Sequence, residues 1–235
     1  RLLLDGLTPV GLHPLRHGPL RDEAGRPLPR GFAADAEALA RRPDGTWLVA
    51  FERRHRIRAY RQLDGPGLYV AAPPGLRNAP SNGGLESLAV LQDGRLFAIA
   101  ETFTPPERPD LRHAWLGQPG AWMPLYWQPS PGFHPTDAAI LPDGSALVLE
   151  RRFSLLGGFA AKLMRTAPDA LRTAGEGAVL SGEVILTLND APLPAENWEG
   201  IAVAPHGDQT LVALISDDNE SILQRSLLLL FAWQG

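Results

Sequence analysis

The stretch 85–101, LESLAVLQDGRLFAIAE, decides the fold of this chain. It reads as an apolar run with an acid near its start, then Asp93-Gly94, then a second apolar run ending in an acid. An Asp-Gly pair between two apolar runs is among the strongest local signals for a β-hairpin, because both turn positions accept a positive φ. Folding about Asp93-Gly94 sets Glu86 opposite Glu101, and cross-strand partners share one face of a sheet. We therefore predict a hairpin that carries two neighbouring carboxylates.

The same pattern recurs in three further segments, each with two acids placed symmetrically about a turn. These are 36–52 with Glu37 and Glu52, 136–150 with Asp137 and Glu150, and 198–217 with Glu199 and Asp217. The leading acids are 49, 51 and 62 residues apart along the chain. A repeat of about 40 to 50 residues built from short strands is typical of a β-propeller, in which each blade is one four-stranded sheet. The sequence thus predicts an all-β propeller.

The number of blades follows from how much sequence surrounds each hairpin. Outer strands are expected at 57–62, 68–72, 115–127, 153–165 and 183–188, with a short helical insertion within 167–177. Too little sequence follows the last hairpin for a full blade, so we expect a strand from residues 1–10 to complete it. We predict one propeller domain over residues 1–235, with about four complete blades from a ring of five or six. A missing N-terminal portion is one explanation for the difference between four visible blades and a ring of five or six.

Composition and motifs exclude several classes of function. The net charge of −4 gives no electrostatic case for binding nucleic acid or an anionic membrane. The absence of cysteine removes thiol catalysis and thiolate metal sites. No apolar run reaches the roughly 18 residues of a membrane span. There is no G-x-S-x-G elbow, P-loop, H-E-x-x-H or dinucleotide fingerprint, so we expect any hydrolysis to use a metal-activated water.

The paired acids are candidate metal ligands, because the first two strands of each blade begin and end at one mouth of the central channel. The expected inner set is Glu37, Glu86, Asp137 and Glu199, and the expected second set is Glu52, Glu101, Glu150 and Asp217. Ligand sets made only of oxygen favour a hard cation, above all Ca²⁺. The alternative is structural: the acids pair with arginines, or accept hydrogen bonds from backbone amides of the neighbouring blade.

Further candidates for substrate chemistry lie next to these acids. His134, three residues before Asp137, is a candidate for proton transfer, although a loop histidine with a satisfied hydrogen bond is the plainer interpretation. Arg53, Arg56 and Arg151 are candidates for binding the anionic part of a substrate, with His55 beside them. Solvated arginines at the blade edge are the alternative.

An ordered set of short motifs resembles the phytase-like family, also described as "esterase-like activity of phytase". They are Asp35-Ala36-Glu37-Ala38-Leu39, Phe51-Glu52-Arg53, Asn82-Gly83-Gly84-Leu85-Glu86-Ser87-Leu88, Pro135-Thr136-Asp137 and Asn197-Trp198-Glu199-Gly200-Ile201. The resemblance covers nearly the whole chain. It implies a β-propeller, commonly bacterial and often exported to the periplasm or medium, with phosphatase or esterase activity. Members usually carry a first glycine-rich repeat, and the resemblance implies that this chain starts after it.

These observations give one main functional hypothesis and two alternatives. The main one is a Ca²⁺-dependent, monomeric hydrolase that cleaves a small anionic phosphate ester or carboxylic ester at the acidic channel mouth. The first alternative is a non-catalytic exported propeller that binds a ligand or partner. The second is a metal-dependent lactonase similar to gluconolactonases.

Overall fold

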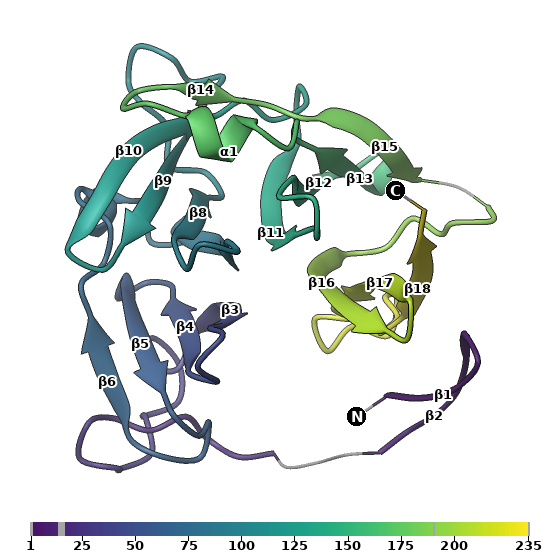
Figure 1. The fold of residues 1–235 in the computed structure, drawn as a ribbon, viewed down its shortest axis with the longest axis horizontal. Helices are drawn as coiled ribbons and strands as arrows, with labels where there is room; N and C mark the ends of the chain where they lie inside the picture. Colours follow the sequence, from purple (N-terminus) through teal and green to yellow (C-terminus); the bar gives the residue numbers. More distant parts are fainter. Residues whose placement is uncertain (1, 14–16, 190, 235) are drawn as a thin grey trace.

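The computed structural model describes residues 2–13, 17–189 and 191–234. Four β-sheets stand around a central axis as the blades of a propeller (Figure 1), and the only helical turns in the described part are short. Blade A contains β3 (Ala36–Arg41), β4 (Trp47–Phe51), β5 (Arg56–Tyr60) and β6 (Gly67–Val70). Blade B contains β7 (Leu85–Val90), β8 (Leu96–Ala100), β9 (Arg112–Gln118), β10 (Ala121–Trp127) and the two-residue β14 (Val179–Leu180), which pairs parallel to β10.

Blade C contains β11 (His134–Ile140), β12 (Ala146–Ser154), β13 (Gly158–Arg165) and β15 (Glu183–Leu188). Blade D has only three strands, β16 (Trp198–His206), β17 (Gln209–Ser216) and β18 (Leu228–Trp233). The helical insertion expected within 167–177 is α1 (Ala170–Thr173), and a 3-10 turn, η1 (Leu76–Asn78), links blades A and B. The predicted all-β propeller is confirmed, and the structure shows four blades. No described helix is long and apolar enough to cross a membrane.

The blades are held together by apolar side chains from facing sheets. Strand residues alternate between the two faces of a sheet, so the central strands of a blade place apolar side chains against the blades on both sides. Leu48 of blade A packs with Trp115 of blade B, and Phe97 of blade B packs with Val148 of blade C. Trp198 occupies the core between blades C and D. The tryptophans of β9 and β10 at positions 115 and 127 are buried, as expected for residues that pack blades.

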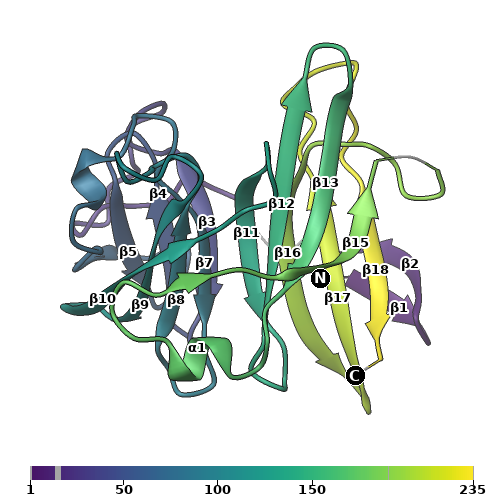
Figure 2. The same cartoon turned by 90° about the horizontal axis from the view of Figure 1, so that it is seen from above.

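The inner strands β3, β7, β11 and β16 enclose a central cavity of about 840 Å³. Figure 1 views the ring of blades along its axis, and Figure 2 shows the four inner strands from the side. The cavity wall carries Glu37, Asp137 and Glu199 among mostly apolar residues. The first strands of blades A, C and D therefore position three of the predicted inner acids along the channel.

The predicted pairing of Glu86 with Glu101 is wrong, for two local reasons. The turn has three loop residues rather than two, because Leu91 N–H donates to the Arg95 carbonyl (2.7 Å) and Gly94 adopts φ 82°. In addition, Leu85 pairs with Ala100 and Ser87 with Ile99, which leaves Glu86 as the extra residue of a β-bulge. A shift of one residue turns a side chain to the other face.

The N-terminal segment does not complete blade D, so that prediction is also wrong. β1 (Leu2–Asp5) and β2 (Thr8–Leu12) pair with each other as a separate hairpin, because a tight turn at Gly6 (φ 58°) lets them satisfy their own backbone hydrogen bonds. Figure 1 shows this hairpin beside the open side of the ring, between blades D and A. The Gly6 carbonyl lies 3.0 Å from His206 Nε2 of blade D.

The face of blade A that looks toward this open side is covered by residues 20–34 instead of another blade. Leu28 packs with Val49, Phe51 and Tyr60 in a small core of its own. Tyr60 is fully buried, and its hydroxyl donates to the Arg21 carbonyl at 3.0 Å. The covering segment therefore substitutes for a neighbouring sheet.

Replacing Tyr60 by Phe should lower the free energy of unfolding by about 1–2 kcal/mol, because it removes the buried hydrogen bond to Arg21 and retains the ring. Tyr69→Phe is the matched control: Tyr69 is 62% exposed, so a change within about 0.5 kcal/mol is expected. Urea unfolding of the three proteins measures both values. Equal stability of Tyr60→Phe and the wild type would contradict this description of the cover.

Candidate functional site

β-Bulges place the inner acids at the channel mouth. In blades A, B and D the extra residue of the first strand is an acid, namely Glu37, Glu86 or Glu199. In each of these blades a second acid follows directly after the second strand. Its backbone N–H donates the last hydrogen bond between the two strands. Glu52 donates to the Asp35 carbonyl (2.9 Å), Glu101 to Gly84 (3.0 Å) and Asp217 to Asn197 (2.9 Å). Three blades thus bring carboxylates to one mouth.

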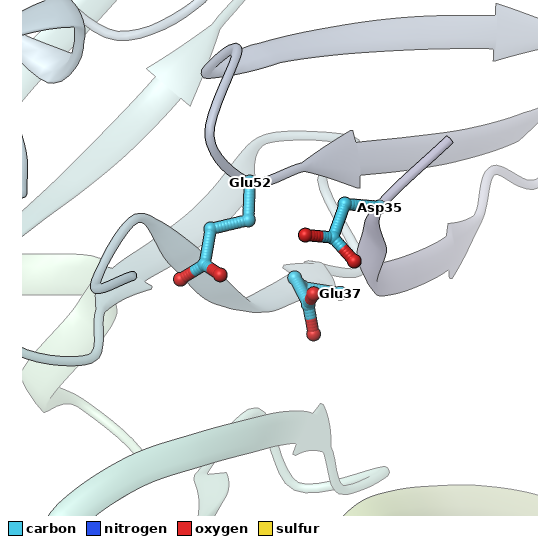
Figure 3. Close-up of side chains that lie close together, drawn as sticks. All are labelled: Asp35, Glu37 and Glu52. Atoms are coloured by element: carbon cyan, nitrogen blue, oxygen red, sulfur yellow. The ribbon is translucent and has the colours of Figure 1, made fainter. Parts of the chain in front are cut away.

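Blade A holds the tightest group of carboxylates in the described part of the chain. One carboxylate oxygen each from Asp35, Glu37 and Glu52 lie within 4.8 Å of one another. Figure 3 shows the three side chains, with Asp35 and Glu37 from the start of β3 and Glu52 from the end of β4. The sequence prediction named Glu37 and Glu52 as ligands and missed Asp35. Asp35 and Glu37 are two residues apart, the spacing that places side chains on one face of a strand.

Glu52 is the most buried of these three acids. The residue is only 7% exposed, and its Oε1 is buried without a hydrogen-bond partner among the described residues. Burial raises the pKa of Glu52, and the backbone amides of Gly83 and Gly84 oppose that rise. Position 84 has no room for a side chain, because a Cβ there would overlap the His55 ring. Glycine therefore lets this backbone pack directly against His55.

The pKa values of the surrounding acids are raised as well. Partial desolvation, followed by the charges of Glu52 and Asp35, raises the pKa of Glu37 to about 7. Burial, then the charge of Glu101, raises the pKa of Glu86 well above its ordinary value. Burial also raises the pKa of Glu199, which Arg151 partly offsets. The mouth favours either bound protons or a bound cation.

Arg151 is the cation that blade C presents to these acids. Its Nη1 lies 3.1 Å from Glu199 Oε1 and donates to Asn197 Oδ1, and its Nη2 lies 3.4 Å from Glu101 Oε1. Arg151 lies seven residues after its turn glycine, as Glu52 and Glu101 do in blades A and B. In blade C an arginine therefore occupies the place of the second acid. Arg53 supplies a further cation, with its Nε 2.8 Å from Asp35 Oδ2.

Asp137 and Glu150 are not brought into this group. The bulge residue of blade C is Thr136, and Asp137 accepts hydrogen bonds from the amides of Ala138 and Ile201, both at 2.8 Å. The second bond ties blade C to blade D. Glu150 is fully buried between blades, accepting from Trp127 Nε1 (2.8 Å) and Ser130 N–H (2.9 Å). These contacts match the structural alternative for the two acids.

The remaining predicted site residues are His134, Asp217 and Arg56. His134 pairs with Arg151 across β11 and β12, and its Nδ1 is 3.5 Å from Arg112 Nη2. Asp217 is exposed at the blade D side of the mouth. The Arg56 guanidinium donates to the carbonyls of Arg54 (2.8 Å) and Ala33, so it does not join the carboxylate group.

Asp137 should make stability depend on pH. Burial raises its pKa to about 7, against the hydrogen bonds from Ile201 and Ala138. The unfolded chain releases this proton near pH 3.8, so the folded state binds more protons between about pH 4 and pH 7 and loses stability as pH rises through that range. Asp137→Asn should flatten this slope. The resulting difference in the free energy of unfolding across the range should be a few kcal/mol at most.

Urea unfolding across this pH range, with a chelator present, measures the slope. Asp110→Asn is the control, because Arg108 lowers the pKa of that exposed carboxyl and its titration falls below the range. An Asp137→Asn variant with the wild-type slope would contradict this interpretation.

Comparisons with solved structures found distant similarities, and one of them, with a TM-score above 0.5, agrees with this architecture. A "putative gluconolactonase" has a TM-score of 0.51 and 15% identity, over 81% of this chain and 60% of that one. A protein of unknown function from Bacteroides caccae has a TM-score of 0.42 and 13% identity, over 86% of this chain and 62% of that one. The Hadza microbial sialidase Hz136 has a TM-score of 0.49 and 11% identity, over 88% and 46%.

The chain thus spans about three fifths of the length of the first two structures. A search of curated proteins gave no match. The family model "Phytase-like: Esterase-like activity of phytase" matches residues 2–220, and the chain belongs to this phytase-like family.

Proposed function

We propose that this protein is a divalent-cation-dependent hydrolase of phosphate or carboxylic esters that acts at the acidic channel mouth. The observation that carries the proposal is the carboxylate group of Asp35, Glu37 and Glu52, in which Glu52 Oε1 is buried without a hydrogen-bond partner. The family description, esterase-like activity, supports the reaction class. The family resemblance also favours an exported protein.

The donor set fits Ca²⁺. Asp35, Glu37 and Glu52 offer only oxygen, and they come from a loop and two strand ends, which suits the six to eight flexible oxygen ligands of that ion. The Arg53 guanidinium neutralises only part of the charge, through Asp35. When bound, Ca²⁺ would polarise an ester oxygen and acidify a water molecule. Glu86 stands near enough to Glu37 and Glu52 to add to the negative field.

The chain's own cations would place the substrate. Arg151 faces the carboxylates from blade C, and its guanidinium can exchange a contact with Glu101 or Glu199 for one with an anionic ester. Arg53 lies at the opposite side, beside Asp35. His134, next to Arg112 and paired with Arg151, is the proposed group for proton transfer to the leaving oxygen. The apolar wall of the cavity would exclude bulk water below the mouth.

The two alternatives differ from this proposal in measurable ways. A lactonase would use the same cation but turn over cyclic esters, and the fold it would require is shared with the "putative gluconolactonase". A non-catalytic binding propeller would need no cation. The structural contacts of Asp137 and Glu150 favour that alternative for those two acids only.

Calorimetric titration with Ca²⁺ tests the cation site. Glu37→Gln combined with Glu52→Gln should weaken Ca²⁺ binding by about a hundredfold or more, because two charged ligands are lost. Asp110→Asn combined with Asp169→Asn is the matched control, since it removes the same charge from exposed acids paired with Arg108 and Arg172. The control should bind as the wild type does.

Turnover of an aryl phosphate, an aryl ester and a lactone, each with Ca²⁺ and with a chelator, then separates the functions. Chelation should abolish cleavage of the acyclic esters. Absence of Ca²⁺ binding in the wild type, or equal affinity in both double variants, would contradict the proposed site. Turnover of the lactone alone would move the assignment to the lactonase alternative.

A further inference from the structure

A second charged pocket, separate from the channel, lies on blade A. It has a volume of about 570 Å³ and is bounded by β5, the turn before it and the covering segment 20–34. Five arginines and one histidine contribute to its wall: Arg53, Arg54, His55, Arg56, Arg58 and Arg77. The pocket is strongly basic in a chain whose net charge is −4.

Strand alternation explains how two of these arginines become buried. Arg56 and Arg58 lie two residues apart on β5, so they share the face of the blade that the segment 20–34 covers. Only 9% of Arg56 and 4% of Arg58 is exposed. Their guanidinium carbons lie over aromatic rings, Arg56 4.0 Å from the centre of Phe51 and Arg58 4.1 Å from that of Tyr69. The rings support the cations but provide no counter-charge.

Carboxylates in and around the pocket neutralise few of these cations. Glu23 pairs with Arg58 at 2.7 Å, and Asp35 outside it pairs with Arg53. Asp22 is occupied by Arg26 and by amides of its own loop. Within the part of the chain that the structure describes, Arg56 donates only to backbone carbonyls, and burial followed by the charge of Arg58 lowers its pKa.

Arg54 and Arg77 are exposed at the pocket wall, and neither forms an ion pair with an acid in the described residues. Buried Arg58 also keeps an Nε–H without an acceptor. A buried cation is costly unless an opposite charge lies beside it.

We propose that this pocket binds a dianionic oxyanion of the phosphate type. Several guanidinium groups that converge on one space suit a ligand with more than one negative charge and several acceptor oxygens. The shared chemistry is the phosphoryl group, supplied either as free phosphate or on a small organic molecule. The site is separate from the cation group in the channel, although the two are neighbours and Arg53 contacts Asp35.

Calorimetric titration in a chelating buffer tests this site without the channel cation. Inorganic phosphate and glycerol phosphate are the probes, and acetate is the singly charged comparison. Phosphate and its ester should bind, and acetate should bind at least about tenfold more weakly. Tighter binding of the ester would identify an organic phosphate as the ligand, and tighter binding of phosphate would identify the free ion.

Arg54→Gln combined with Arg77→Gln should weaken phosphate binding by about tenfold or more, because two exposed donors at the pocket wall are lost. Both residues are exposed, so the variant should fold. Arg108→Gln combined with Arg172→Gln removes the same charge elsewhere on the surface and should bind as the wild type does. No binding by the wild type, equal binding of acetate, or equal losses in both variants would overturn the proposal.

Discussion

Repulsion between carboxylates at the channel mouth is the constraint on which the rest of the site depends. Among the described residues seven acids interact there, and the two guanidinium groups paired with them belong to Arg53 and Arg151. The seven acids are Asp35, Glu37, Glu52, Glu86, Glu101, Glu199 and Asp217. Such an arrangement is tolerated in a folded protein only if protons, cations or a ligand reduce the charge. Burial is the first cause of the raised pKa values, and for Glu37 and Glu86 the charge of a neighbouring carboxylate is the second.

The sequence predicted the all-β propeller, most of its strands and the general position of the acids, because Asp-Gly turns and alternating apolar runs are local signals. It did not predict the register. A glycine with positive φ adds one residue to the turn, and a bulge adds another at the mouth. Counting from the turn glycine would have distinguished Asp137 and Glu150, which each lie one residue nearer to the turn than the acids of blades A and B. That single residue sends Glu150 into the core and brings Arg151 to the mouth.

Other features depend on contacts that no local pattern contains. The separate hairpin of β1 and β2 and the cover formed by residues 20–34 are long-range outcomes, and Pro- and Gly-rich loops give little information about where they dock. The cover creates a pocket from Arg56 and Arg58. The sequence analysis named Arg56 as a candidate for binding an anion, but it did not predict that a distant segment buries Arg56 beside Arg58. The two proposed sites are thus built differently: one from the repeat itself, and one from a segment outside the repeat.

The most direct test of this account is a crystal structure grown with Mn²⁺ in place of Ca²⁺ and measured at an X-ray energy where manganese scatters anomalously. The account predicts an anomalous peak bonded to the carboxylates of Asp35, Glu37 and Glu52, with Asp137 and Glu150 retaining their bonds to Ile201 and Trp127. A mouth without a peak, or a peak bonded to Asp137 or Asp217 instead, would contradict it.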